Sequence, residues 1–126
     1  MEESKVPSRR ILVVDDHADT ADTLAMLLQL LGHELMSCYD GPSTLAAAAT
    51  FRPQIVILDL GLPKMSGYEV ATRLREMPEL QSTWLVALSG WGREEDRRRA
   101  KEAGFDHHLL KPTELSVLEQ LIASLP

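Results

Sequence analysis

The sequence has few of the features on which secreted and membrane-spanning proteins depend. It contains one cysteine, Cys38, so no disulfide can form within the chain, and we expect a buried, inert thiol in a reducing compartment. The first ten residues are polar and charged and do not resemble a signal peptide. No stretch approaches the roughly 20 apolar residues needed to cross a bilayer. We therefore expect a cytoplasmic protein without membrane insertion.

Other absences disfavour several classes of ligand. No glycine-rich phosphate loop follows the first predicted strand, which disfavours nucleotide binding. The formal net charge of −6 argues mildly against direct contact with nucleic acid, which usually requires a basic face. Zinc is disfavoured because the histidines have no convincing ligand spacing. These histidines are His17, His33, His107 and His108.

The size and composition of the chain indicate one globular domain. It has 126 residues, of which 44% are hydrophobic and 25% charged, as is usual for a folded domain. Residues 1–9 include Pro7 and have little apolar content, so we predict a flexible N-terminal leader there. The folded domain is predicted to span residues 10–126.

Five short apolar runs alternate with helical segments, and this alternation predicts an α/β fold. A continuous apolar run is typical of a strand buried on both faces of a parallel sheet. The order predicts a flavodoxin-like, doubly wound, five-stranded parallel sheet with strand order 2-1-3-4-5 and five helices. The predicted strands are 11–14, 35–39, 55–58, 84–88 and 106–110; the helices are one capped by Asp19 or Thr20 and ended by Gly32, then 41–50, 68–77, 93–103 and one capped by Thr113.

Polar residues follow four of the five predicted strands. Asp15 and Asp16 follow the first strand, Asp59 the third, Ser89 the fourth and Lys111 the fifth. In the predicted order these four strands are consecutive neighbours, and folds of this type bind ligands at the carboxyl ends of the strands. We therefore expect the five side chains to converge on one cleft.

Such a cleft has the chemistry required for phosphoryl transfer. Two carboxylates about 4 Å apart repel by roughly 4 kcal/mol at an effective dielectric of 20, so the cluster needs a cation. Carboxylate oxygens suit Mg²⁺, which also binds phosphate oxygens. Transfer to an aspartate, which gives an acyl phosphate, rests on positioning and charge neutralisation. Lys111 would supply a positive charge and Ser89 a hydroxyl donor.

Four motifs in this order resemble the response-regulator receiver family of two-component signalling. The resemblance extends from about residue 10 to residue 125. The matching segments are Ile-Leu-Val-Val-Asp-Asp at 11–16, Asp-Leu-Gly-Leu-Pro-Lys-Met-Ser-Gly at 59–67, Leu-Ser-Gly at 88–90 and Leu-Lys-Pro at 110–112.

The resemblance implies a role for each matching residue. Asp59 would accept the phosphoryl group and would ligate Mg²⁺. Asp16 would bind the ion directly, Asp15 mostly through water, and the carbonyl of Gly61 would complete the protein ligands. The family is a set of signalling switches, so we expect no separate metabolic substrate and no enzyme in the ordinary sense.

The resemblance also implies a partner and a response. The donor would be a phosphohistidine on a sensor histidine kinase or a histidine phosphotransfer domain, and the partner-binding surface would switch after transfer. Ser89 would turn toward the phosphoryl group and Lys111 would pair with it. The bond between Lys111 and Pro112 would be cis, as an X-Pro bond permits.

This sequence departs from the usual family pattern at three positions. His108 stands where the family usually has an aromatic switch residue, and an imidazole can swing or titrate. Gly61 has no side chain to orient a hydrolytic water, and Trp91 would shield the site. We therefore predict that the phosphoryl group is lost slowly.

The sequence disfavours two alternatives to a phosphorylated switch. A receiver-like scaffold that binds partners without phosphorylation is disfavoured by the intact acidic, hydroxyl and lysine set. A phosphatase of the haloacid-dehalogenase type would carry Asp-x-Asp-x-Thr after a strand, and no equivalent is present. The stretch 86–112 resembles receivers fused behind sensor histidine kinases, so the chain is either such an excised domain or a stand-alone receiver. The sequence leaves the oligomeric state open.

Overall fold

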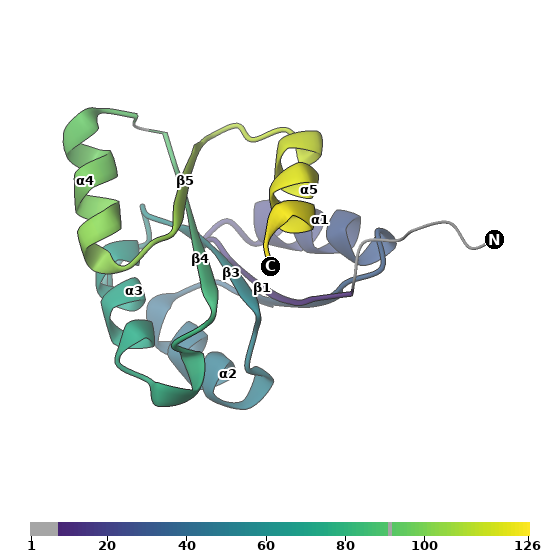
Figure 1. Cartoon of the computed structure of the whole chain (residues 1–126), viewed down its shortest axis with the longest axis horizontal. Helices are drawn as coiled ribbons and strands as arrows, with labels where there is room; N and C mark the ends of the chain where they lie inside the picture. The colour runs from purple at the N-terminus through teal and green to yellow at the C-terminus, as the bar shows by residue number, and fades with distance from the viewer. Residues whose placement is uncertain (1–7, 91) are drawn as a thin grey trace.

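The computed structural model describes residues 8–90 and 92–126, which form a parallel sheet covered by helices on both faces (Figure 1). The strand order is β2-β1-β3-β4-β5, which confirms the predicted topology. The strands are β1 (Arg10–Val14), β2 (Glu34–Cys38), β3 (Ile55–Asp59), β4 (Trp84–Ser89) and β5 (His107–Leu110). The helices are α1 (Ala18–Leu30), α2 (Gly41–Phe51), α3 (Gly67–Arg75), α4 (Glu94–Ala103), α5 (Leu115–Ser124) and the short 3₁₀ helix Pro78–Leu80.

Alternate side chains of the strands point into two separate hydrophobic cores. On β1, Ile11 and Val13 pack with residues of α1 and α5, whereas Leu12 and Val14 pack with residues of α2, α3 and α4. Figure 1 shows α1 and α5 on one side of the sheet and α3 and α4 on the other. This two-sided burial accounts for the continuous apolar runs, because helices cover both faces of the inner strands.

The position of each strand in the sheet explains its pattern of burial. All five residues of β3, which lies between β1 and β4, are buried. The edge strand β2 alternates exposed and half-buried residues up to Cys38, which is buried. Burial raises the pKa of the Cys38 thiol above its usual value of 9.0, as expected for an unreactive cysteine.

The predicted start of α1 was wrong. The helix begins at Ala18, preceded by His17, so Asp19 lies within the first turn and Thr20 follows it. Asp15 accounts for the early start, because its carboxylate accepts a hydrogen bond from the backbone N–H of His17 and turns the chain directly after β1.

The predicted cap of α5 and one helical segment also differ from the structure. Thr113 does not cap α5: its hydroxyl donates to the carbonyl of Leu110, and the helix begins after Glu114. The 3₁₀ helix Pro78–Leu80 was not predicted. It fits a proline at the first helical position and places the buried Leu80 in the core.

Arg9 belongs to the fold and not to the leader. It is buried, its backbone N–H donates to His33 Nδ1, and its guanidinium donates to the carbonyls of Leu125 and Pro126. Residues 1–7 lie outside the described part of the chain, so a flexible leader there stays a prediction. Among the described helices, none combines the length and apolar character needed to span a bilayer.

Candidate functional site

The strand register places the candidate residues at one edge of the sheet. Asp59 pairs with Leu88 across β3 and β4, and Ser89 pairs with Leu110 across β4 and β5. The backbone N–H of Lys111 donates to the carbonyl of Ser89 at 2.8 Å, so Lys111 begins the segment directly after β5. The carboxyl ends of four neighbouring strands therefore present the predicted polar set together.

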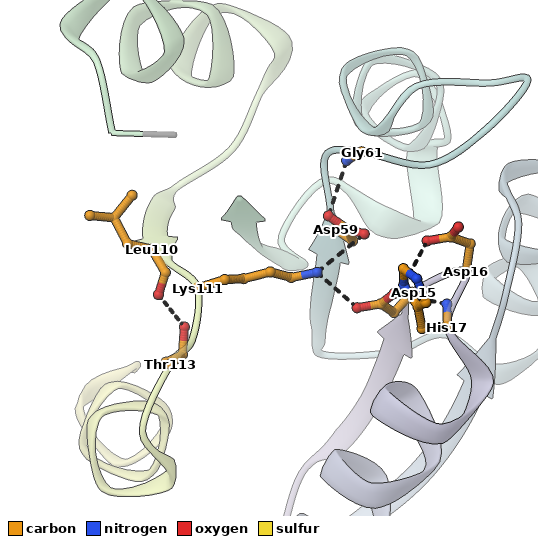
Figure 2. A network of polar contacts seen from close by, with 8 residues as sticks. All are labelled: Asp15, Asp16, His17, Asp59, Gly61, Leu110, Lys111 and Thr113. Atoms are coloured by element: carbon orange, nitrogen blue, oxygen red, sulfur yellow. Dashed lines mark hydrogen bonds and ion pairs between the residues drawn. The ribbon is translucent and has the colours of Figure 1, made fainter. Parts of the chain in front are cut away.

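The ammonium group of Lys111 connects two of the carboxylates (Figure 2). Its Nζ lies 3.0 Å from Oδ2 of Asp15 and 3.3 Å from Oδ2 of Asp59. Asp15 is 3% exposed and Asp59 is 7% exposed, so both carboxylates are largely removed from water. Burial acts to lower the pKa of Lys111, but Asp15 and Asp59 outweigh it and hold this pKa above the usual value.

Asp15 is held by contacts on both sides of its carboxylate. Oδ1 accepts the backbone N–H of His17 at 3.0 Å, and Oδ2 accepts the ammonium group of Lys111. Burial alone would raise the pKa of Asp15, but these two donors outweigh burial, and its pKa lies below the usual value of 3.8. The carboxylate is therefore stabilised in its charged form.

The imidazole of His17 lies beside the acidic pair. Its Nδ1 is 3.4 Å from Oδ1 of Asp15 and 3.5 Å from Oδ1 of Asp16. The three side chains place ligand atoms within 4.8 Å of one another. The sequence analysis did not assign His17 to the site, although its position directly after the two aspartates was the available signal.

The backbone around Asp59 is closely packed. The N–H of Gly61 donates to Oδ1 of Asp59 at 3.0 Å, and the N–H of Leu60 donates to the carbonyl of Leu88. A Cβ on Gly67 would lie 2.7 Å from both the carbonyl oxygen of Asp59 and Cα of Leu60. Only a glycine therefore lets the first residue of α3 pack directly against the chain at Asp59.

Ser89 forms a hydrogen bond that the sequence analysis did not predict. Its Oγ lies 2.8 Å from Nε2 of His108 on the neighbouring strand. Both side chains lie on the face of the sheet that α4 covers, since Ala87, the β4 partner of His108, packs in that core. Burial and the nearby Arg97 lower the pKa of His108 below its usual 6.5. The sequence feature that could have indicated this hydrogen bond is His108 itself, which stands where the family usually has an aromatic residue.

Comparison with known proteins is consistent with this geometry. The sequence profile of the response regulator receiver domain matches residues 11–123. The chain belongs to the response regulator receiver family. Receiver domains are signalling switches that take phosphoryl groups from histidine kinases.

Two curated relatives illustrate the range of proteins that carry such a domain. An uncharacterised 14.6 kDa protein of Leptolyngbya boryana is 34% identical over 89% of this chain and 86% of its own length. The transcriptional regulatory protein PrrA of Mycobacterium tuberculosis is 37% identical over 94% of this chain. The chain spans about half (48%) of the length of PrrA.

Solved receiver structures have the same fold. The chemotaxis protein CheY4 of Vibrio cholerae superimposes with a TM-score of 0.88 at 27% identity, covering 94% of this chain and 100% of that one. The BeF3-activated receiver domain of DrrB gives a TM-score of 0.81 at 28% identity, covering 92% of this chain and 95% of that one.

The donor set of this receiver domain fits a hard divalent cation. Asp15, Asp16 and Asp59 supply carboxylate oxygens at one edge of the sheet, and no cysteine lies among them. Mg²⁺ prefers such oxygen ligands. Asp16, unlike Asp15 and Asp59, is exposed, so its carboxylate is open to a hydrated ion. The Gly61 carbonyl as a ligand stays a prediction.

The remaining site predictions have mixed outcomes. The peptide bond between Lys111 and Pro112 is cis, as the family resemblance implied. Trp91 lies outside the described residues, so its shielding role stays a prediction. The proposed origin in a hybrid kinase, the absence of direct nucleic-acid contact and the cytoplasmic location also stay predictions.

Proposed function

We propose that this receiver domain accepts one phosphoryl group on Asp59 from a phosphohistidine partner, with Mg²⁺ bound by Asp15, Asp16 and Asp59. The observation that carries the proposal is the position of Lys111, whose ammonium group lies within ion-pair distance of Asp15 and Asp59 together. A lysine with a purely structural role would not require two buried carboxylate partners. A partner-binding scaffold has no need of the cluster at all.

The transfer step is a substitution at phosphorus. A carboxylate oxygen of Asp59 forms the new bond to phosphorus while the bond between phosphorus and the imidazole nitrogen of the donor breaks, and the leaving imidazole takes up a proton. The N–H of Gly61 donates to Oδ1 of Asp59, and Oδ2 lies 3.3 Å from Nζ of Lys111, so the carboxylate is fixed in orientation before transfer. Asp59 and Lys111 thus hold the nucleophile and a counter-charge in one place.

Two positively charged groups would offset the negative charge of the phosphoryl group: the Mg²⁺ held by the acidic residues and the ammonium group of Lys111. When bound, Mg²⁺ supplies positive charge to the phosphoryl oxygens. Lys111 pairs with Asp15 and Asp59 in the structure, and its flexible side chain can follow a phosphoryl oxygen after transfer. Asp15 retains its charge because His17 and Lys111 both donate to it.

The donor must reach Asp59 from outside the sheet edge. An apolar groove between α1 and α5 opens beside the site and is lined by Leu24, Leu27, Lys111, Pro112 and Leu115. A helix of a histidine kinase or a histidine phosphotransfer domain, which carries the phosphohistidine, is the occupant that this position supports. A surface that contacts only water would instead be expected to be polar.

The response to transfer would pass through the contact between Ser89 and His108. His108 also lines a groove between α4 and β5, together with Arg97, Phe105 and His107. A movement of Ser89 toward the phosphoryl group would draw His108 with it through their 2.8 Å hydrogen bond and would therefore shift the wall of this groove. This connection supports a phosphorylation-dependent change of the partner-binding surface.

Intact mass spectrometry with acetyl phosphate tests the proposal. With Mg²⁺, we expect one phosphoryl adduct on the wild-type chain, none on Asp59→Asn and none on the wild type when EDTA replaces Mg²⁺. Asp22→Asn is the matched control, because the carboxylate of Asp22 accepts from the hydroxyl of Tyr39 and, among the described residues, contacts none of the proposed metal ligands and not Lys111. An adduct that persists in Asp59→Asn would refute the assignment of the acceptor.

A further inference from the structure

His108 and Ser89 form a side-chain pair that the proposed transfer chemistry does not explain. His108 lies opposite Ala87 in the register of β4 and β5, and Ser89 is two residues further on, so both side chains project from the same face. Oγ of Ser89 and Nε2 of His108 are 2.8 Å apart. Ser89 is 1% exposed, so the hydrogen bond is shielded from water on the serine side.

The environment of Nδ1, the second ring nitrogen of His108, indicates which atom donates in the hydrogen bond between His108 and Ser89. Nδ1 is buried and has no hydrogen-bond partner among the described residues. A neutral imidazole has its proton on one nitrogen only, and a buried N–H without an acceptor is less tolerable than a buried acceptor without a donor. The proton is therefore favoured on Nε2, which donates to Oγ of Ser89.

The charged groups around His108 leave the neutral ring favoured. Burial and, to a lesser degree, Arg97 on α4 lower the pKa of His108, whereas Asp96 on the same helix acts in the opposite direction. Oδ2 of Asp96 is also buried and has no hydrogen-bond partner in the described part of the chain, although Nε of Arg93 lies 3.9 Å from it. The charge of Asp96 favours a proton on the ring of His108, so Asp96→Asn tests the competing arrangement in which Nδ1 carries the proton.

We propose that His108 is a positioning residue that donates from Nε2 to Oγ of Ser89 and so orients the hydroxyl proton of Ser89 toward a phosphoryl oxygen on Asp59. A hydroxyl oxygen that accepts one hydrogen bond has the direction of its own O–H restricted. This role rests on the proposed function, since it needs a phosphoryl group at Asp59. This positioning role differs from that of an aromatic switch residue that packs through its ring, because it depends on a ring nitrogen and not on ring volume.

Nitrogen NMR of the histidine rings tests the direction of the hydrogen bond without any phosphorylation. In the wild-type chain at neutral pH we expect His108 to show a protonated Nε2 and an unprotonated Nδ1, with His108→Gln used to assign the signals. A proton on Nδ1, with a signal that changes in Asp96→Asn, would overturn the inference and support a bond in which Ser89 donates.

Three substitutions then test the effect on transfer. Glutamine places an amide nitrogen near the position of Nε2, asparagine is one carbon shorter, and phenylalanine keeps the ring without a nitrogen. We expect phosphorylation by acetyl phosphate to be about tenfold slower in His108→Asn and His108→Phe, and to recover largely in His108→Gln, because groups that orient a reacting residue contribute roughly 10- to 100-fold. In Ser89→Ala, adding His108→Phe should have no further effect.

The outcomes separate this inference from the proposed function. No adduct on the wild-type chain would refute the proposed function and, with it, the role of His108 in transfer. Normal phosphorylation of the wild type with equal rates in the glutamine, asparagine and phenylalanine variants would overturn only the positioning role. Circular dichroism of each variant ensures that a slower rate is not a loss of fold.

Discussion

Lys111 lies closer to Asp15 than to Asp59, with Nζ to Oδ2 distances of 3.0 and 3.3 Å. The ammonium group is thus shared between the carboxylate that would hold the metal and the one that would accept the phosphoryl group. The shared ammonium group offsets the repulsion between these two buried carboxylates and so stabilises them close together. It also means that Lys111 and a divalent cation compete for the same negative charge.

Replacement of Lys111 by methionine should therefore change two quantities in opposite directions. Phosphorylation by acetyl phosphate should slow by about 100-fold, because removal of one preorganised donor to a developing charge has roughly this effect. Mg²⁺ should bind more tightly, because Asp15 and Asp59 lose their counter-charge. Stopped-flow kinetics and calorimetric titration measure the two effects.

Arg73→Met is the matched control for Lys111→Met. Arg73 is exposed on α3 and, among the described residues, pairs only with Glu69 across one helical turn, so neither the rate nor the Mg²⁺ affinity should change. Weaker Mg²⁺ binding in Lys111→Met would contradict the shared-charge account.

The stability of the fold should depend on pH through Asp15. Its pKa lies below 3.8 in the folded chain, so it binds a proton more readily when unfolded. Its contribution to the free energy of unfolding is present above about pH 3.8 and is lost as the pH falls through the folded pKa. Urea denaturation at pH 6 and pH 3 should show a smaller loss of stability in Asp15→Asn than in the wild type. Equal losses would contradict the prediction.

Gly61 offers a test of the predicted slow loss of the phosphoryl group. A Cβ at this position would lie 3.6 Å from Oδ1 of Asp59, an ordinary contact, so a side chain fits and reaches the acceptor. Gly61→Asn should shorten the lifetime of the adduct about tenfold, because a polar group can orient an attacking water. Gly61→Leu, which is similar in size but apolar, should not. Equal lifetimes in both variants, measured by decay of the intact-mass adduct, would refute this reading of Gly61.

Gly67 should be sensitive to the smallest side chain. An added Cβ would lie 2.7 Å from backbone atoms of Asp59 and Leu60, which cannot move without shifting the acceptor. Gly67→Ala should lower the free energy of unfolding by about 1–3 kcal/mol, as overpacking usually does. An added Cβ at Gly90 meets no atom within 4 Å apart from its chain neighbours in the described part of the chain, so Gly90→Ala should change the free energy of unfolding by no more than about 0.5 kcal/mol. Urea denaturation compares them, and equal effects would contradict the steric argument.

The sequence predicted the sheet and the residues at its edge because both depend on local patterns. Buried parallel strands leave continuous apolar runs such as Ile55 to Leu58, and polar residues directly after them must lie at the carboxyl edge. Strand order then brings Asp59, Ser89 and Lys111 together. These inferences need no knowledge of side-chain rotamers.

The unpredicted features depend on contacts between distant residues. Nothing local indicates that Arg9 binds the carbonyls of the last two residues of the chain, or that Nε2 of His108 meets Ser89. The start of α1 was misplaced because the carboxylate of Asp15 accepts the N–H of His17 and turns the chain there, so the helix begins at Ala18, before the expected cap. Tertiary geometry in each case determined the local structure.

Chemical mapping of the modified carboxylate tests the central claim most directly. Borohydride reduces an acyl phosphate of aspartate to homoserine, so the wild-type chain can be phosphorylated with acetyl phosphate and Mg²⁺, reduced, digested and sequenced by tandem mass spectrometry. The account predicts homoserine at position 59 and unmodified aspartate at positions 15 and 16. Homoserine at 15 or 16, or no homoserine from a phosphorylated sample, would contradict it.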